Sequence, residues 1–332
     1  MAWRADRGDR RAPVVLAVGE CMLELRHRSD LVLDVGFAGD TYNTAVYLHR
    51  MSEDLGEAVE VGYLTGLGSD AYSEKMRAAW ANEGIEDRSV TVPGRQPGVY
   101  AVETDSAGER TFTYWRSASA ASALFAGTDW VGQVSGDLVH FSGISLQLMS
   151  ARARQALFDR LAALRRAGAR VSFDTNFRPA GWTDAAAARE VFATAAAHSD
   201  IVLATFDDEF LLTGDQDPVR TAERYRSLGP KEVVVKLGAD GALVADTTGC
   251  RHVPAIRVET VVDTTAAGDS FGGAYLAGRL ADLAPREAAE LGAELAAEVV
   301  QSPGAILPLA GSGRAPRRGT SSSGQTESAA VT

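Results

Sequence analysis

The chain has 332 residues, of which 45% are hydrophobic and 23% are charged, and its formal net charge is −11 at pH 7. This length allows two domains or one large α/β domain. The acidic balance disfavours binding to nucleic acid or to an anionic membrane, because both need basic surface, and no apolar run reaches the ~18 residues of a membrane span.

Polar segments open and close the chain. Residues 1–12 are polar and Arg-rich and lack the apolar core of a secretory signal, so we expect a cytoplasmic location. Residues 310–332 are rich in Ser, Gly and Thr and almost free of large apolar side chains. Both segments are therefore predicted to be disordered extensions of one folded domain over 13–309.

Short apolar runs alternate with Ala-, Leu- and Arg-rich segments inside that domain. Helices are expected at 151–167, ending at Gly168, and at 183–197, where Thr183 and Asp184 are candidate N-caps. Buried parallel strands are expected at 14–18, 59–64, 138–141, 170–173, 201–204, 232–236 and 242–245. The alternation predicts an α/β fold with a doubly wound, mostly parallel sheet and helices on both faces.

Two segments, 24–36 and 98–116, break this alternation. Their apolar and polar residues alternate as in half-exposed strands, and residues 105–108 of the second segment are typical of a hairpin turn. Such strands do not fit a sheet that helices cover on both faces. They predict a small β-sheet that stands off the main domain as a lid.

The two cysteines, Cys21 and Cys250, lie far apart in apolar, strand-like sequence. They form neither a disulfide framework nor a metal cluster, and the five histidines show no metal-ligand spacing. We expect both thiols to be free and buried or half-buried.

The strongest local signal lies at 261–275, VVDTTAAGDSFGGAY. A strand is expected to end at Asp263, followed by a turn and an Ala- and Gly-rich helix. Small residues at the start of a helix leave backbone N–H groups uncovered, and such an end binds anions. Asp269 in the first turn can act as a base beside that anion hole, or it can merely complement the helix dipole.

Two competing motifs fail. Residues 268–272 match G-x-S-x-G, the nucleophile elbow of α/β-hydrolases, but that fold places its His after the Ser, and the last His here is His252. Gly66-Leu67-Gly68 lacks the third Gly of a dinucleotide fingerprint, and the chain has no G-x-x-x-x-G-K-[ST].

The segment Asp263-Thr-Thr-Ala-Ala-Gly-Asp-Ser-Phe271 resembles the C-terminal signature of ribokinase-like (PfkB-type) carbohydrate kinases, and Gly36-Phe-Ala-Gly39-Asp-Thr-Tyr-Asn43 resembles their N-terminal glycine motif. Ala38 replaces the first Gly of the glycine pair, which should be tolerated if its φ is negative. The resemblance runs from about Val14 to Leu309 with the motifs in order. It implies the ribokinase-like fold and dimerisation through the lid.

Within this family the chain is most similar to kinases of the sugar acid 2-keto-3-deoxygluconate. The residues that carry this similarity include Gly39-Asp40 with Asn43, the lid segment 103–116, and Asp174-Thr-Asn-Phe-Arg-Pro179. The resemblance implies a carboxylate site in which guanidinium groups make paired, charge-assisted hydrogen bonds. The implied substrate-binding residues are Gly39, Asp40, Asn43, Tyr100, Tyr114, Arg116, Arg178 and Asp269. Arg116 and Arg178 can instead be surface or structural pairs.

The implied reaction is phosphoryl transfer from ATP with Mg²⁺. Asp269 would be the base, and the N–H groups of Ala266, Ala267 and Gly268 would hold the developing negative charge. Lys236, Gly238 and Gly241, with Gly268, match the nucleotide side, although Leu237 departs from the basic residue often found there. Glu209 matches the metal-motif Glu and would act through water, although Phe206 stands where the family has Asn.

Other functions stay open at this point. A kinase for a neutral ketose, of the fructokinase type, or for another deoxy-sugar acid is the nearest enzymatic alternative. A sugar-binding pseudokinase without catalysis is an alternative of another class, and a dehydrogenase is a third. The intact Gly268-Asp269 pair favours catalysis.

Overall fold

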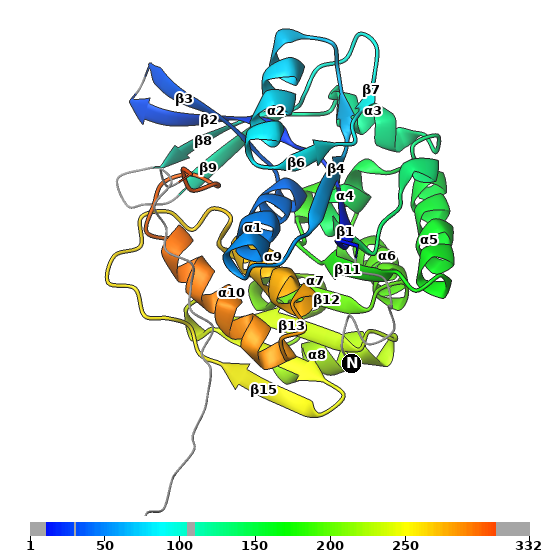
Figure 1. Cartoon of the computed structure of the whole chain (residues 1–332), viewed down its shortest axis with the longest axis vertical. Helices are drawn as coiled ribbons and strands as arrows, with labels where there is room; N and C mark the ends of the chain where they lie inside the picture. The colour runs from blue at the N-terminus through cyan, green and yellow to red at the C-terminus, as the bar shows by residue number, and fades with distance from the viewer. Residues whose placement is uncertain (1–10, 30, 105–109, 310–332) are drawn as a thin grey trace, which may run out of the picture.

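The computed structural model describes residues 11–29, 31–104 and 110–309 (Figure 1). The predicted tail at 310–332, nearly all of the predicted N-terminal extension and the predicted turn at 105–108 lie outside these residues. No helix among the described residues has the length and apolar character needed to cross a bilayer.

A nine-stranded sheet in the order β15-β14-β13-β12-β11-β10-β1-β4-β6 forms the centre of the molecule. Its strands are β1 (Val14–Val18), β4 (Glu60–Leu64), β6 (Ile85–Asp87), β10 (Leu138–Ser142), β11 (Arg170–Asp174), β12 (Ile201–Thr205), β13 (Glu232–Lys236), β14 (Ala242–Asp246) and β15 (Gly249–Val253). The pairs from β6 through β13 are parallel, and β14 and β15 are antiparallel. All seven predicted strands and the mostly parallel sheet are confirmed, but the expectation of a parallel strand at 242–245 is wrong because β14 pairs antiparallel with both neighbours.

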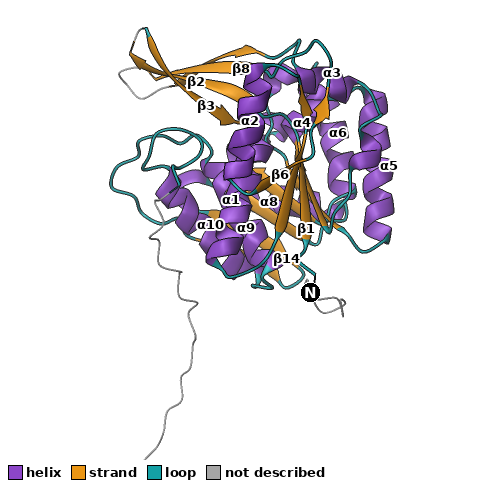
Figure 2. Cartoon of the chain, turned by 45° about the horizontal axis from the view of Figure 1, so that its top comes forward, coloured by secondary structure: helices purple, strands orange, loops and turns teal. Residues whose placement is uncertain are grey.

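Helices cover both faces of this sheet (Figure 2). One apolar core lies under α1 (Asp40–Asp54), α2 (Ala71–Asn82), α9 (Ala267–Leu280) and α10 (Pro285–Val299). The opposite core lies under α3 (Ala120–Ala126), α4 (Gly143–Leu148), α5 (Ala151–Arg166), α6 (Ala185–Ala197), α7 (Phe206–Thr213) and α8 (Pro218–Ser227). Both predicted helices are confirmed, and Asp184 caps α6 by accepting a hydrogen bond from the Ala187 N–H.

The predicted lid is confirmed as a separate four-stranded sheet in the order β3-β2-β8-β9, which stands off the main body beyond the start of α1 (Figures 1 and 2). It consists of β2 (Met22–Ser29), β3 (Val32–Ala38), β8 (Val99–Thr104) and β9 (Arg110–Trp115). Segment 24–36 is therefore part of a hairpin of two strands. Short elements complete the fold: β5 (Gly66–Leu67), β7 (Val90–Thr91) and the 3₁₀ turns η1 (Val131–Gln133), η2 (Pro179–Gly181) and η3 (Gly238–Asp240).

Two other expectations are wrong. Cys21 is buried, but Cys250 is exposed because it lies on the polar edge strand β15. No strand ends at Asp263 in the described structure. Residues 254–266 form a loop in which Val261 and Val262 are exposed, and the Val262 N–H donates to the Val300 carbonyl. The two valines before Asp263 therefore form part of an exposed loop and not the predicted strand.

Candidate active site

The site lies at the carboxyl edge of the parallel strands, where α/β folds place their ligands. The helices α1 and α9 both begin at this edge and pack tightly against each other. A Cβ at Gly273 of α9 would lie 2.7 Å from the Thr44 carbonyl oxygen of α1, so only Gly fits at this contact. The seam brings Asn43 and Asp269, which are 226 residues apart in sequence, into direct contact.

The first turn of α9 is open to a ligand. Its N-cap residue, Ala266, has φ 60 and ψ 11, the left-handed conformation, and supplies no side-chain cap. Alanine rarely adopts this left-handed conformation, and residues held in it are found most often at functional sites. No side chain caps this turn, and among the predicted anion-site donors the Ala267 N–H already donates to the Thr264 carbonyl oxygen over 3.3 Å. The anion site at 266–268 stays a prediction.

Asp269 is held by a hydrogen bond from its neighbour on α1. The Asn43 side-chain amide donates to Asp269 Oδ2 over 2.8 Å, and Asn43 Oδ1 accepts from the Gly39 N–H. Burial, with the negative charges of Asp40 and Asp174, raises the pKa of Asp269 to about 7, although Asn43 and Lys236 oppose the rise. A carboxylate with such a pKa is suited to take a proton near neutral pH.

Asp40 begins α1 and faces the same edge. The Asn176 side-chain amide donates to Asp40 Oδ2 over 2.8 Å, and Asn176 itself has a positive φ of 31. Gly39 precedes Asp40, and a Cβ there would lie 2.1 Å from the Glu20 carbonyl oxygen. The glycine motif therefore allows the start of α1 to approach the loop that follows strand β1. Ala38 is not among the described residues with positive φ, so this position accepts Ala in place of the motif Gly without backbone strain.

Two residues that the sequence analysis did not select as site residues, Asp174 and Asn176, belong to this cluster. Asp174 ends β11, accepts the Asn176 N–H on one oxygen, and pairs with Lys236 on the other. The sequence signal that could have identified both residues is the polar Asp-Thr-Asn at the end of a buried strand.

The lid contributes Arg116, which follows β9. Its Nη2 lies 2.6 Å from Glu20 Oε2, and the Glu20 side chain is only 1% exposed and also accepts from Ser119. Burial raises the pKa of Glu20, with Arg116 acting against this rise. Within the described residues, the Arg116 Nε is buried without a hydrogen-bond partner, so this guanidinium retains a free donor.

The two lid tyrosines differ in what their hydroxyls contact. The Tyr100 hydroxyl is buried and donates to Glu24 Oε1 over 2.6 Å, whereas Tyr114 beside it is half exposed. Burial raises the pKa of the Tyr114 phenol, and the charges of Arg116 and Arg178 oppose the rise. Both guanidinium groups therefore lie within electrostatic reach of this hydroxyl.

Arg178 follows β11 and is 53% exposed. Its Nη1 donates to Asp208 Oδ2 over 3.0 Å. Burial raises the pKa of Asp208, and Arg178 opposes that rise. This arginine forms an ion pair, but the exposed part of its guanidinium stays accessible.

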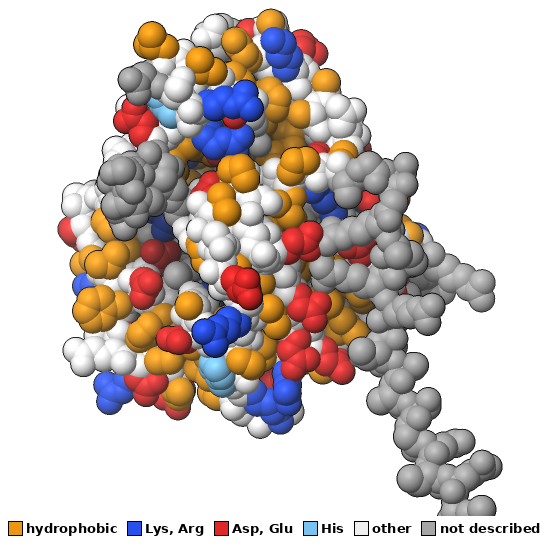
Figure 3. Space-filling view, turned by 90° about the vertical axis from the view of Figure 1, so that its left-hand side faces the viewer, with side chains coloured by type: hydrophobic (Ala, Val, Ile, Leu, Met, Phe, Trp, Pro, Cys, Tyr) orange, Lys and Arg blue, Asp and Glu red, His pale blue; other side chains and the backbone are white. Residues whose placement is uncertain are grey.

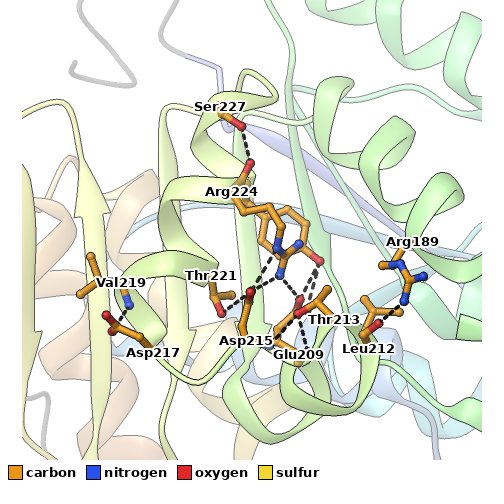
Figure 4. A network of polar contacts seen from close by, with 11 residues as sticks. Arg189, Glu209, Leu212, Thr213, Asp215, Asp217, Val219, Thr221, Arg224 and Ser227 are labelled. Carbon is orange, nitrogen blue, oxygen red and sulfur yellow. Dashed lines mark hydrogen bonds and ion pairs between the residues drawn. The ribbon is translucent and has the colours of Figure 1, made fainter. Parts of the chain in front are cut away.

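Glu209 lies in a polar network on α7 and α8 (Figure 4). Its carboxylate is fully buried and pairs with Arg224 at 2.7 Å, while the Tyr225 hydroxyl donates to both of its oxygens. Arg224 also pairs with Asp215 at 2.9 Å. The structure thus does not join Glu209 directly to the other predicted residues, and the described residues contain no group of three His, Cys, Asp or Glu side chains fit for a metal.

The loop after β13 is shaped by two glycines. Gly238 has φ 59 and Gly241 has φ 94, both unfavourable for other residues, and a Cβ at Gly241 would lie 2.1 Å from the Val253 carbonyl oxygen. The loop thus turns tightly from β13 into the antiparallel strand β14. Lys236 points from the end of β13 to Asp174.

The side of the molecule shown in Figure 3 mixes acidic, basic and apolar side chains, without one continuous basic stripe. This view agrees with the acidic net charge.

The chain is similar to proteins of known family. The family model described as pfkB family carbohydrate kinase matches residues 14–310. A 2-dehydro-3-deoxygluconokinase of Dickeya dadantii is 40% identical over 303 residues, 89% of this chain and 97% of that protein. A fructokinase of Klebsiella pneumoniae is 30% identical over 274 residues, 82% of this chain and 85% of that protein. The crystal structure of a Thermotoga maritima 2-dehydro-3-deoxygluconokinase has TM-score 0.78 and 22% identity, covers 90% of this chain and 95% of that one, and supports the fold.

Proposed function

The chain belongs to the pfkB family of carbohydrate kinases, and we propose that it phosphorylates 2-keto-3-deoxygluconate (2-dehydro-3-deoxygluconate) with ATP, giving 2-keto-3-deoxy-6-phosphogluconate. The 40% identity with a kinase of that name, against 30% with a fructokinase, supports this substrate. The observation that carries the proposal is the pair of guanidinium groups that flank the site. Arg116 follows the lid strand β9 with its Cζ 6.0 Å from the centre of the Tyr114 ring, and Arg178 follows Asn176, whose amide donates to Asp40. Two guanidinium groups at one site suit a substrate with a carboxylate.

In the proposed reaction, the C6 hydroxyl oxygen of the sugar attacks the γ-phosphorus of ATP. Asp269 takes the hydroxyl proton, the new O–P bond forms, and the bond from the γ-phosphorus to the β–γ bridging oxygen breaks. ADP leaves with that electron pair. Asn43, which donates to Asp269, would hold it in place for this step, and Asp40, which accepts from Asn176, would accept hydrogen bonds from the sugar.

The open first turn of α9 is the proposed anion hole. The N–H groups of Ala266, Ala267 and Gly268 would face the transferred phosphoryl group, where fixed donors stabilise developing charge. The turn of Gly238 and Gly241 after β13 would hold the rest of the nucleotide.

The described residues hold no ready cluster of metal-ligating side chains, so Mg²⁺ would arrive on the nucleotide. Mg²⁺ prefers oxygen ligands and keeps several waters, so phosphate oxygens and water would supply most of its shell. Glu209, paired with Arg224 and Tyr225, would reach the ion only through that water. When bound, the ion neutralises phosphate charge.

A substrate panel with purified protein, ATP and Mg²⁺ tests the proposal. We expect 2-keto-3-deoxygluconate to be phosphorylated with a kcat/KM at least tenfold above that for fructose or ribose, measured by coupled ADP release. A clear preference for a neutral sugar would assign the chain to a ketose kinase. ADP release with none of these sugar substrates would favour the pseudokinase.

We further propose that the chain self-associates through the outer face of the lid sheet and that the enzyme acts in the cytoplasm. Leu33, Val35 and Trp115 share one face of this sheet by strand register, and they are 40%, 57% and 58% exposed. Exposed apolar side chains gathered on one face are typical of a contact surface. Sedimentation of the full chain should give a dimer that Trp115→Glu converts to a monomer, and a monomeric wild type would contradict this proposal.

A further inference from the structure

A buried ion pair joins two strands under the proposed phosphoryl-transfer site. Lys236 Nζ at the end of β13 lies 2.8 Å from Asp174 Oδ2 at the end of β11, and their side chains are 10% and 7% exposed. A buried pair of this kind is weak evidence for stability, because the desolvation of both charges offsets their attraction. Stability alone therefore does not explain why this buried ion pair lies under the proposed site.

The ammonium of Lys236 lies beside the opening turn of α9. A Cβ at Gly268 would lie 3.2 Å from Lys236 Nζ, so glycine at 268 leaves room for this cation against the anion hole. An ammonium group has three donors, and Asp174 accepts one of them. The others are available to a phosphate oxygen placed at the same turn.

Asp174 also fixes the geometry on the sugar side. Its Oδ1 accepts the Asn176 N–H over 3.1 Å, and the Asn176 side chain in turn donates to Asp40. A chain of polar contacts thus runs from Lys236 through Asp174 and the Asn176 turn to Asp40. It links the proposed nucleotide side of the site to the start of α1.

We propose that Lys236 contacts the transferred phosphoryl group itself, and that Asp174 is the positioning residue that holds the ammonium against the anion hole. This inference rests on the proposed kinase function and adds two roles to it. Lys236 supplies a fixed positive charge where negative charge develops, and Asp174 keeps it there before ATP binds.

The pair also sets the electrostatic environment of Asp269. The groups that act on Asp269 are Asp40 and Asn43 of α1, Asp174 of β11 and Lys236 of β13, and Asp269 itself acts on Arg178 and on Tyr47 of α1. Removing Asp174 deletes a negative neighbour and should lower the pKa of Asp269. Removing Lys236 deletes a positive neighbour and should raise it.

The experiment compares Lys236→Met, Asp174→Asn and the double variant. Calorimetry without sugar should show that Lys236→Met weakens ATP binding at least tenfold and leaves adenosine binding unchanged, because only ATP carries the phosphates. The acidic limb of kcat against pH should move to lower pH in Asp174→Asn and to higher pH in Lys236→Met. Lys231→Met, at an exposed residue directly before the start of β13, is the matched control and should change neither measurement.

The double variant removes both buried charges, so it tests the idea even if a single variant does not fold. It should bind ATP as weakly as Lys236→Met while its acidic limb stays near that of the wild type. Unchanged ATP affinity in Lys236→Met or in the double variant would overturn the proposal, as would limbs that do not move in opposite directions. Failure of the sugar-acid assignment alone would leave the ATP-binding result intact, because that arm contains no sugar.

Discussion

Replacing Asp269 by Asn should lower kcat by about 10²–10⁴-fold and leave the Kd for ATP within about twofold of the wild type. The amide keeps the shape of the side chain and can still accept the Asn43 hydrogen bond, but it cannot take a proton. Rapid-quench turnover with the best sugar substrate, together with calorimetric ATP binding, checks both parts. Turnover at the wild-type rate would exclude Asp269 as the base.

The same substitution should make the folded protein more stable above pH 7. The pKa of Asp269 lies at about 7, above the ordinary value of 3.8, so its ionised form is disfavoured in the folded state. This cost is full above the folded-state pKa and disappears as pH falls below 3.8. Urea unfolding at pH 8 and pH 4 should show a stability gain for Asp269→Asn only at pH 8, which also establishes that the variant folds. The wild-type kcat should fall about tenfold per pH unit below 7.

Replacing Arg116 by Ala should raise KM for the sugar acid by roughly 10- to 150-fold. A hydrogen bond to a charged group contributes about 1.5–3 kcal/mol, and the Arg116 side chain, which is 21% exposed, would make one to the substrate carboxylate. For the analogue whose carboxylate is reduced to an alcohol, the same substitution should raise KM far less. Arg178→Ala should act in the same direction, with a smaller effect because its guanidinium is half exposed. Initial rates with the sugar acid and with its alcohol analogue give the ratio of the two KM values for each variant.

The control must deal with Glu20, which Arg116→Ala leaves buried without its cation. The double variant Glu20→Gln/Arg116→Ala removes both charges and should keep the same selectivity loss with better stability. Arg286→Ala deletes an arginine on α10 that is about as exposed as Arg178 (60% against 53%) and is paired with Glu290, and it should leave the ratio of the two KM values unchanged. An equal loss for acid and alcohol would contradict carboxylate recognition by Arg116.

The sequence predicted the sheet and the lid because both follow from local patterns. Buried parallel strands such as Val233–Val235 are continuous apolar runs, and the lid strands alternate. The same reasoning failed at 261–263, where two valines lie in an exposed loop, because apolar character alone does not specify a hydrogen-bonding partner. Strand β6 was not predicted because Ile85 is its one apolar residue and Glu86 and Asp87 follow it.

The candidate site was predicted as a set of residues and not as a set of contacts. Gly39, Asn43 and Asp269 were selected from motifs, and the packing of α1 on α9 brings them together. Pairings such as Arg116 with Glu20, or Glu209 with Arg224, depend on side chains distant in sequence and cannot be read from one element. Glu209 illustrates the difference, since its motif position suggested access to a metal and its surroundings give it an arginine and a tyrosine.

The seam between α1 and α9 has one more consequence. Because Thr44 O and the Tyr47 side chain fill the space beside Gly273, a single methyl group there would wedge the two helices apart. Asn43 and Asp269 are carried by those helices, one on each side of the wedge. A side chain at position 273 would therefore separate the proposed base from the amide that holds it, although residue 273 itself touches neither.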